Sequence, residues 1–235
     1  MKRSTACFAG IIFALLTYGY GVITVQYKTF PFEEIRYAKR MLMGQSLISR
    51  SPHYLHRKSF FEELGQNKYD AVFIGDSLTE SAEWEDIFPE FKIANRGIAG
   101  DTSGGVLERI DSILSTKARK SFVMIGINDF NRGSSVDAVF ENYREIIKNL
   151  LEHEFEVYIQ STILGGRRES TSNRSIISLN KKLDAFSSEN NNITYIDLNR
   201  DLSRYGFLKP EFSEDDIHLN SKGYKSWKDS IKKYL

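Results

Sequence analysis

The chain has 235 residues, 41% of them hydrophobic, and its 32 basic and 31 acidic side chains leave a formal net charge of +1. This composition is typical of a folded globular protein and argues against an intrinsically disordered chain. The balanced charge offers no electrostatic basis for binding nucleic acid, so no nucleic-acid partner is predicted.

Cysteine and histidine usage argues against disulfides and metal sites. The single cysteine, Cys7, cannot form an intramolecular disulfide or a zinc site of paired cysteines. None of the four histidines lies in an HExxH motif. The sequence therefore predicts no metal site and no cofactor.

The first distinct segment is a run of 19 uncharged residues from Cys7 to Val25, CFAGIIFALLTYGYGVITV. At a rise of about 1.5 Å per residue, a helix of this length crosses the core of a bilayer. A cleaved signal peptide is the alternative, but the run exceeds a usual signal core and lacks a clear A-x-A cleavage site. We therefore expect residues 1–27 to be an N-terminal membrane anchor or signal segment, with residues 7–25 in the lipid bilayer.

Two features around this run give opposite indications of orientation. Basic residues after the run outnumber those before it: Lys28, Arg36, Lys39 and Arg40 against Lys2 and Arg3. By the positive-inside rule this count places the main domain in the cytoplasm. The very short N-terminal tail instead resembles that of a signal-anchor, which favours a domain on the opposite side of the membrane. We expect a membrane-anchored protein whose domain is extracytoplasmic, in the periplasm or outside the cell.

Residues 28–67 are polar and mixed in charge, with apolar residues at irregular helical spacing. Within them, the stretch FEEIRYAKRMLMG predicts a short helix that ends at Gly44. We expect a helical stalk or linker over these residues, followed by the main domain at residues 68–235.

From Tyr69 onward, apolar strand candidates alternate with amphipathic helix candidates. The expected strands are residues 70–77, 91–98, 120–129, 155–164 and 193–199. The expected helices are residues 102–114, 134–153, 173–189 and 221–235. Strands that are apolar on both faces and separated by helices form a parallel sheet covered on both sides. We therefore predict an α/β fold, a three-layer α/β/α sandwich with a five-stranded parallel sheet.

Residues suited to nucleophilic catalysis follow the expected strands. In parallel α/β sheets, functional side chains lie at these carboxyl ends of the strands. Ser77 follows the first strand, and a serine nucleophile needs a base and a group that orients the base. In SEDDIHLNSKGY, Asp215 stands three residues before His218, a spacing at which a carboxylate can reach an imidazole. Asp216 is the alternative orienting carboxylate. Taken singly, Ser77 is more typical of a turn and His218 of the surface.

Donors for an oxyanion are expected at two further strand ends. Gly100 follows the second strand, and a glycine lets a backbone N–H approach a substrate closely. Asn128, at the end of the third strand, supplies a side-chain amide. Together with the Ser77 N–H, these groups are candidates for a three-donor oxyanion hole.

The blocks GDSLTE, NRGIAGDTSGGVLERI, GIND and DDIHLN resemble, in order, the four motif blocks of the SGNH (GDSL) hydrolase family. The resemblance spans about residues 69–235 and is greatest to the branch of platelet-activating-factor acetylhydrolase and carbohydrate O-acetylesterases. It implies that Ser77 is the nucleophile, with His218 and Asp215 completing a catalytic triad. It also implies that Ser77, Gly100 and Asn128 form the oxyanion hole.

The expected function is that of a serine esterase acting on small acyl esters, above all acetyl esters, on a carbohydrate or another surface molecule. An acyltransferase that uses the same residues is one alternative, and it would form product only when an acceptor is present. A non-catalytic carbohydrate-binding module of the same fold is the other, and it would bind without turnover.

Overall fold

The computed structural model describes residues 17–21, 51–64, 68–167 and 170–235, and the chain divides into two units, Met1–Gln45 and Ser46–Leu235. In the first unit, residues 17–21 are helical. The rest of the expected membrane segment at residues 7–25, and the expected helix ending at Gly44, lie outside the described residues. No helix in the described part of the chain has the length and hydropathy needed to span a bilayer. The membrane anchor and the extracytoplasmic location therefore stay predictions from the sequence.

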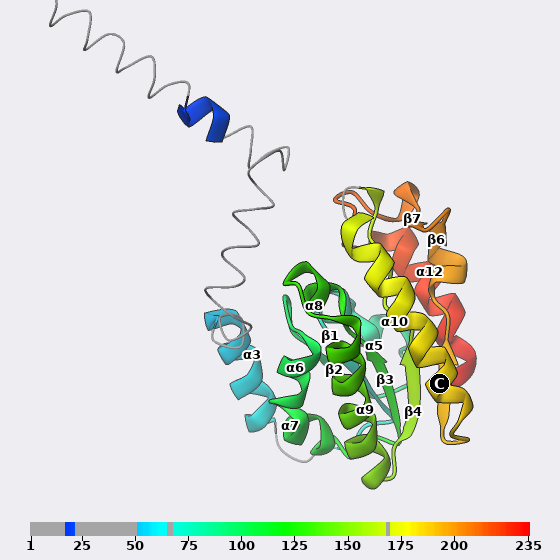
Figure 1. Cartoon of the computed structure of the whole chain (residues 1–235). Helices are drawn as coiled ribbons and strands as arrows, with labels where there is room; N and C mark the ends of the chain where they lie inside the picture. The colour runs from blue at the N-terminus through cyan, green and yellow to red at the C-terminus, as the bar shows by residue number, and fades with distance from the viewer. Residues whose placement is uncertain (1–16, 22–50, 65–67, 168–169) are drawn as a thin grey trace, which may run out of the picture. The chain divides into compact units, whose positions relative to one another are not determined.

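The second unit is built on one sheet of five parallel strands in the order β2-β1-β3-β4-β5 (Figure 1), which confirms the expected parallel sheet. The strands are β1 (Ala71–Gly75), β2 (Ile93–Gly97), β3 (Lys120–Met124), β4 (Glu156–Gln160) and β5 (Ile193–Ile196).

Helices cover both faces of this sheet because successive strand residues point to opposite sides. In β1, Val72 and Ile74 join one hydrophobic core, whereas Ala71 and Phe73 join the other. The first core includes α6 (Ser103–Leu107), α7 (Ile110–Leu114), α9 (Val136–Glu152) and α10 (Ser170–Ser188). The second includes α4 (Ser77–Glu80), α5 (Trp84–Ile87), α11 (Asn199–Leu202) and α12 (Ser221–Ile231). Figure 1 shows the first group of helices in front of the sheet.

Two elements differ from the expectation. The expected helix at residues 102–114 is divided into α6 and α7, because the backbone leaves the helical conformation at Arg109, whose side chain is fully buried. The expected third strand at residues 120–129 ends at Met124. The chain turns at Gly126, whose φ of 134° favours glycine, and α8 (Ile127–Asn131) follows. Asn128 therefore lies on a short helix and not at a strand end.

Helix α3 (Pro52–Glu63) lies within the segment expected as a helical stalk, and its Tyr54 and Phe61 are buried. Other described elements have no counterpart in the expected set. Strands β6 (Ser203–Arg204) and β7 (Phe207–Leu208) form a small antiparallel pair before α12. Two 3₁₀ turns, η3 (Pro210–Phe212) and η4 (Lys232–Tyr234), flank that last helix. These elements are too short or too irregular in apolar spacing to give a periodic signal.

Candidate active site

The candidate site lies where the carboxyl ends of the central strands meet. Gly75 at the end of β1 pairs with Gly97 of β2 on one side and with Met124 of β3 on the other. The strand order reverses here, since β1 connects to β2 on one side and the chain then crosses to β3 on the other. Such a switch point is where open α/β sheets bind ligands. The segments that follow these strands carry Ser77, Gly100 and Asn128.

Ser77 is the first residue of α4, directly after the strand-to-helix turn. Asp76 caps this helix, because its Oδ1 accepts a hydrogen bond from the Leu78 N–H at 3.0 Å. The Ser77 side chain is partly exposed, while Asp76 beneath it is fully buried. The helix start thus presents the Ser77 hydroxyl at the surface of the switch point.

His218 connects Ser77 to a carboxylate. Its Nε2 lies 3.1 Å from the Ser77 Oγ, and its Nδ1 lies 2.6 Å from Asp215 Oδ2. Asp215 Oδ1 also accepts hydrogen bonds from the backbone N–H groups of Ile217 and His218. Of the two candidate carboxylates, Asp215 contacts the imidazole, whereas Asp216 has a φ of 71° and its carbonyl accepts a hydrogen bond from the Gly166 N–H. The three side chains form one hydrogen-bonded chain.

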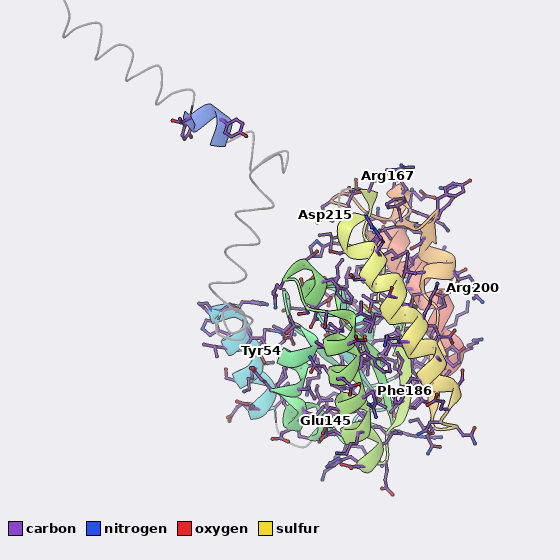
Figure 2. The ribbon with its side chains drawn as sticks, viewed as in Figure 1. Tyr54, Glu145, Arg167, Phe186, Arg200 and Asp215 are labelled. Atoms are coloured by element: carbon purple, nitrogen blue, oxygen red, sulfur yellow. The ribbon has the colours of Figure 1, made fainter. Side chains whose placement is uncertain are left out.

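These hydrogen bonds keep Asp215 ionised. Burial opposes ionisation, but the His218 ring and the two backbone N–H groups hold the pKa of the Asp215 carboxyl well below its usual range. A charged carboxylate at Nδ1 favours the tautomer whose Nε2 faces Ser77 without a proton, ready to accept one. Asp215 lies on the loop before α12 (Figure 2).

Gly100 lies in a tight turn from Ile98 to Asp101. The Asp101 N–H donates to the Ile98 carbonyl at 3.0 Å, and Gly100 has a φ of 76° at the third position, as a type II turn requires. The turn is held on the sheet by the Ile98 N–H, which donates to the Gly75 carbonyl at 3.1 Å. The Asn128 side-chain amide donates to the Asp101 carbonyl at 3.0 Å, so Asn128 lies beside this turn.

Two charged side chains that the motifs did not single out, those of Arg109 and Arg132, contact this turn. Arg109 donates through Nε to Asp101 Oδ2 at 2.9 Å, and both side chains are almost wholly buried. The Arg132 guanidinium donates to the Gly100 carbonyl. One signal was available in the sequence: Arg109 falls among the apolar positions of the expected helix, three residues after Val106 and four before Ile113.

Burial raises the pKa of Asp76 to about 7, and the charges of Asp101 and Asp129 add to this effect. Over the range between its ordinary pKa of 3.8 and about 7, folded Asp76 holds a proton that the unfolded chain has lost. The free energy of unfolding therefore falls as pH rises through this range, by about 1.4 kcal/mol per pH unit for one proton.

The variant Asp76→Asn should remove this contribution, because an amide keeps an acceptor for the Leu78 N–H and does not titrate. We expect its stability relative to the wild type to be higher at about pH 7.5 than at about pH 4.5. Urea unfolding of both proteins at each pH measures the difference. An identical difference at both pH values would contradict a protonated Asp76 in the folded state.

Among the described residues, no group of three or more His, Cys, Asp or Glu side chains is placed to hold a metal ion. The hydroxyl, imidazole and carboxylate of Ser77, His218 and Asp215 form the hydrogen-bonded chain at this site.

Comparison with known proteins identifies the family. Residues 73–226 match the GDSL-like lipase/acylhydrolase family. The N-acylneuraminate cytidylyltransferase of Streptococcus agalactiae serotype V is 28% identical over 162 residues, which cover 69% of this chain and 38% of that protein. The matched region thus spans well under half of the length of this curated relative.

Solved structures share the fold. A Streptococcus pneumonia protein provisionally described as a platelet activating factor is 25% identical, with a TM-score of 0.72 over 77% of this chain and 92% of that one. A GDSL-like lipase from Bacteroides thetaiotaomicron is 24% identical, with a TM-score of 0.68 over 77% and 96%. An acetyl-xylooligosaccharide esterase from Geobacillus stearothermophilus is 15% identical, with a TM-score of 0.60 over 72% and 94%. The chain belongs to the GDSL-like lipase/acylhydrolase family.

Proposed function

We propose that this protein is a serine esterase that uses Ser77, His218 and Asp215 as a catalytic triad. The observation that carries the proposal is the hydrogen-bonded chain from the Ser77 Oγ through both nitrogens of His218 to Asp215. It lies at the switch point of a sheet in a chain of the acylhydrolase family. This combination of residue types and contacts is what nucleophilic acyl transfer needs.

In the proposed reaction, the Ser77 Oγ attacks the ester carbonyl while His218 Nε2 accepts the hydroxyl proton. The charge of Asp215 stabilises the imidazolium that forms. The tetrahedral intermediate collapses, His218 returns the proton to the leaving alcohol, and an acyl-serine remains. Water then attacks the acyl group while His218 Nε2 takes a proton from it. The second tetrahedral intermediate collapses, His218 gives this proton to the Ser77 Oγ, and the carboxylic acid leaves.

The oxyanion of each tetrahedral intermediate is proposed to bind the backbone N–H groups of Ser77 and Gly100 and the side-chain amide of Asn128. Asn128 already uses one amide N–H to hold the Asp101 carbonyl, and an asparagine amide has a second N–H to donate. The same side chain can therefore support the turn and bind the substrate.

The variant Asn128→Ala is expected to lower kcat by about 10²–10³-fold, the usual loss for one oxyanion donor. Its kcat for p-nitrophenyl acetate, measured next to an unfolding curve, tests this. A near-normal kcat in a folded variant would remove Asn128 from the proposed oxyanion hole.

For the substrate, we propose a small acyl ester, acetyl above all, on a carbohydrate or a similarly bulky alcohol. The His218 and Asp215 side chains are 48% and 54% exposed, so the side of the site from which the leaving alcohol departs is open to a large group. Two fold neighbours are described as esterases of acetylated xylan or its oligosaccharides. The S. agalactiae relative is named for an acylated sugar acid.

Hydrolysis of p-nitrophenyl acetate and p-nitrophenyl butyrate by the full chain in detergent tests the proposal. We expect turnover of both, with acetate preferred. Preference for butyrate would contradict the small acyl group. Absence of turnover in folded protein would contradict the esterase itself, and turnover that appeared only with an added alcohol acceptor would favour the acyltransferase instead.

A further inference from the structure

Glu80, the last residue of α4, contacts the turn that carries Gly100. Its Oε2 accepts a hydrogen bond from the Ala99 N–H at 2.5 Å, and its side chain is only 17% exposed. Glu80 belongs to the same short helix as Ser77, three residues further along. One helix therefore carries the proposed nucleophile and also holds the backbone next to the proposed oxyanion donor.

Helix α3 supplies two basic side chains that contact this carboxylate. Arg57 Nε lies 3.1 Å from Glu80 Oε1, and His53 Nε2 lies 3.1 Å from each carboxylate oxygen. Arg57 also donates from its guanidinium to the Gly97 carbonyl at 3.4 Å, at the end of β2. The helix thus contacts both Glu80 and the strand that leads into the turn.

Buried residues hold α3 in this place. The Tyr54 hydroxyl donates to the Gly105 carbonyl of α6 at 2.9 Å, and Figure 2 shows Tyr54 on the side of α3 that faces this part of the domain. The Phe61 ring packs against the guanidinium groups of Arg57 and Arg96, each 4.7 Å from its centroid. Both Tyr54 and Phe61 are at most 2% exposed, so the position of Arg57 is well determined by packing.

The geometry of the turn explains why Ala99 matters. The Gly100 N–H belongs to the peptide between Ala99 and Gly100, the central peptide of the turn. Type I and type II turns differ by a flip of about 180° of this peptide, which reverses the direction of its N–H. The turn's own hydrogen bond joins Ile98 and Asp101 and leaves the Ala99 N–H to find another acceptor. Glu80 supplies that acceptor, and Arg132 holds the Gly100 carbonyl beyond the central peptide.

We infer that Glu80 is a positioning residue that, held by Arg57 and His53 of α3, keeps the Gly100 N–H directed into the oxyanion hole. The inference rests on the proposed function of this site. It also makes α3, which precedes the family match at residues 73–226, a part of the support of the active site.

The test compares full-chain variants for kcat and KM on p-nitrophenyl acetate, with the concentration of active sites titrated by a fluorophosphonate. Glu80→Ala should lower kcat by about 10–100-fold, less than outright loss of an oxyanion donor, with KM little changed. Glu80→Gln keeps an oxygen acceptor for Ala99 and should recover most of the rate. Arg57→Ala should lower kcat less than Glu80→Ala. Lys58→Ala is the matched control on α3, since Lys58 pairs only loosely with Glu62, at 3.9 Å, and its rate should not change.

Amide hydrogen exchange at Ala99 gives a readout that does not depend on turnover. The Ala99 N–H should exchange faster in Glu80→Ala than in the wild type and in Lys58→Ala. A wild-type kcat per titrated site in Glu80→Ala would overturn the inference, as would unchanged exchange at Ala99. If the wild type itself lacked turnover, the proposed function would fail. Exchange at Ala99 would then decide separately whether Glu80 holds the turn.

Discussion

Ser77→Ala is expected to reduce kcat for ester hydrolysis by about 10⁴–10⁶-fold, as loss of a triad serine does in other hydrolases. The substitution removes the atom that attacks the carbonyl and leaves His218 without its 3.1 Å partner. Stability should change by only about 0.5 kcal/mol, because the side chain is partly exposed and fills no core position. Steady-state kinetics on p-nitrophenyl acetate, with an unfolding curve for each protein, measures both effects.

Covalent labelling strengthens this test. A fluorophosphonate should add to the wild type at Ser77 and fail to add to Ser77→Ala, as read by mass spectrometry of the digested protein. Ser81→Ala is the matched control, because Ser81 is the exposed C-cap residue directly after the same helix α4. It should keep both turnover and labelling. Wild-type turnover in Ser77→Ala would exclude Ser77 as the nucleophile.

Arg109→Met is expected to have the largest effect on stability, lowering the free energy of unfolding by about 3–5 kcal/mol. Methionine is long enough to fill much of the space, but it leaves Asp101 buried without its positive partner at 2.9 Å. It also removes the guanidinium that donates to the Gly75 carbonyl at 3.3 Å. Urea unfolding followed by tryptophan fluorescence measures the loss.

Arg119→Met is the matched control. The Arg119–Glu156 pair has the same 2.9 Å separation, but its side chains are 76% and 44% exposed. An exposed pair contributes about 0–1 kcal/mol, because water screens the charges and solvates each partner when the pair is broken. Equal losses of unfolding free energy in Arg109→Met and Arg119→Met would show that burial does not determine how much the Arg109–Asp101 pair contributes to stability.

Local sequence determined the features that depend on short-range patterns. Strand residues that are apolar on both faces predicted the parallel sheet, and β1 is buried along its whole length as expected. The contact between Asp215 and His218 spans only about one turn of chain, so the spacing made Asp215 a candidate, and the family resemblance favoured it over Asp216. The position of Ser77 after a strand likewise follows from the adjacent residues. The expected membrane segment at residues 7–25 is also a local pattern, and it stays a prediction.

Tertiary structure alone decided the contacts between distant segments. The Ser77–His218 contact joins residues far apart in the chain, and here the family resemblance supplied what spacing could not. No local pattern predicted that Arg109 would divide a helix to reach Asp101, or that Glu80 would join α3 to the Gly100 turn. A buried or half-buried charge is stable only where a partner from another element meets it, so its place depends on the packing of the whole domain. Asn128, expected at a strand end, lies on a helix instead, because β3 ends at Met124 and the chain turns at Gly126.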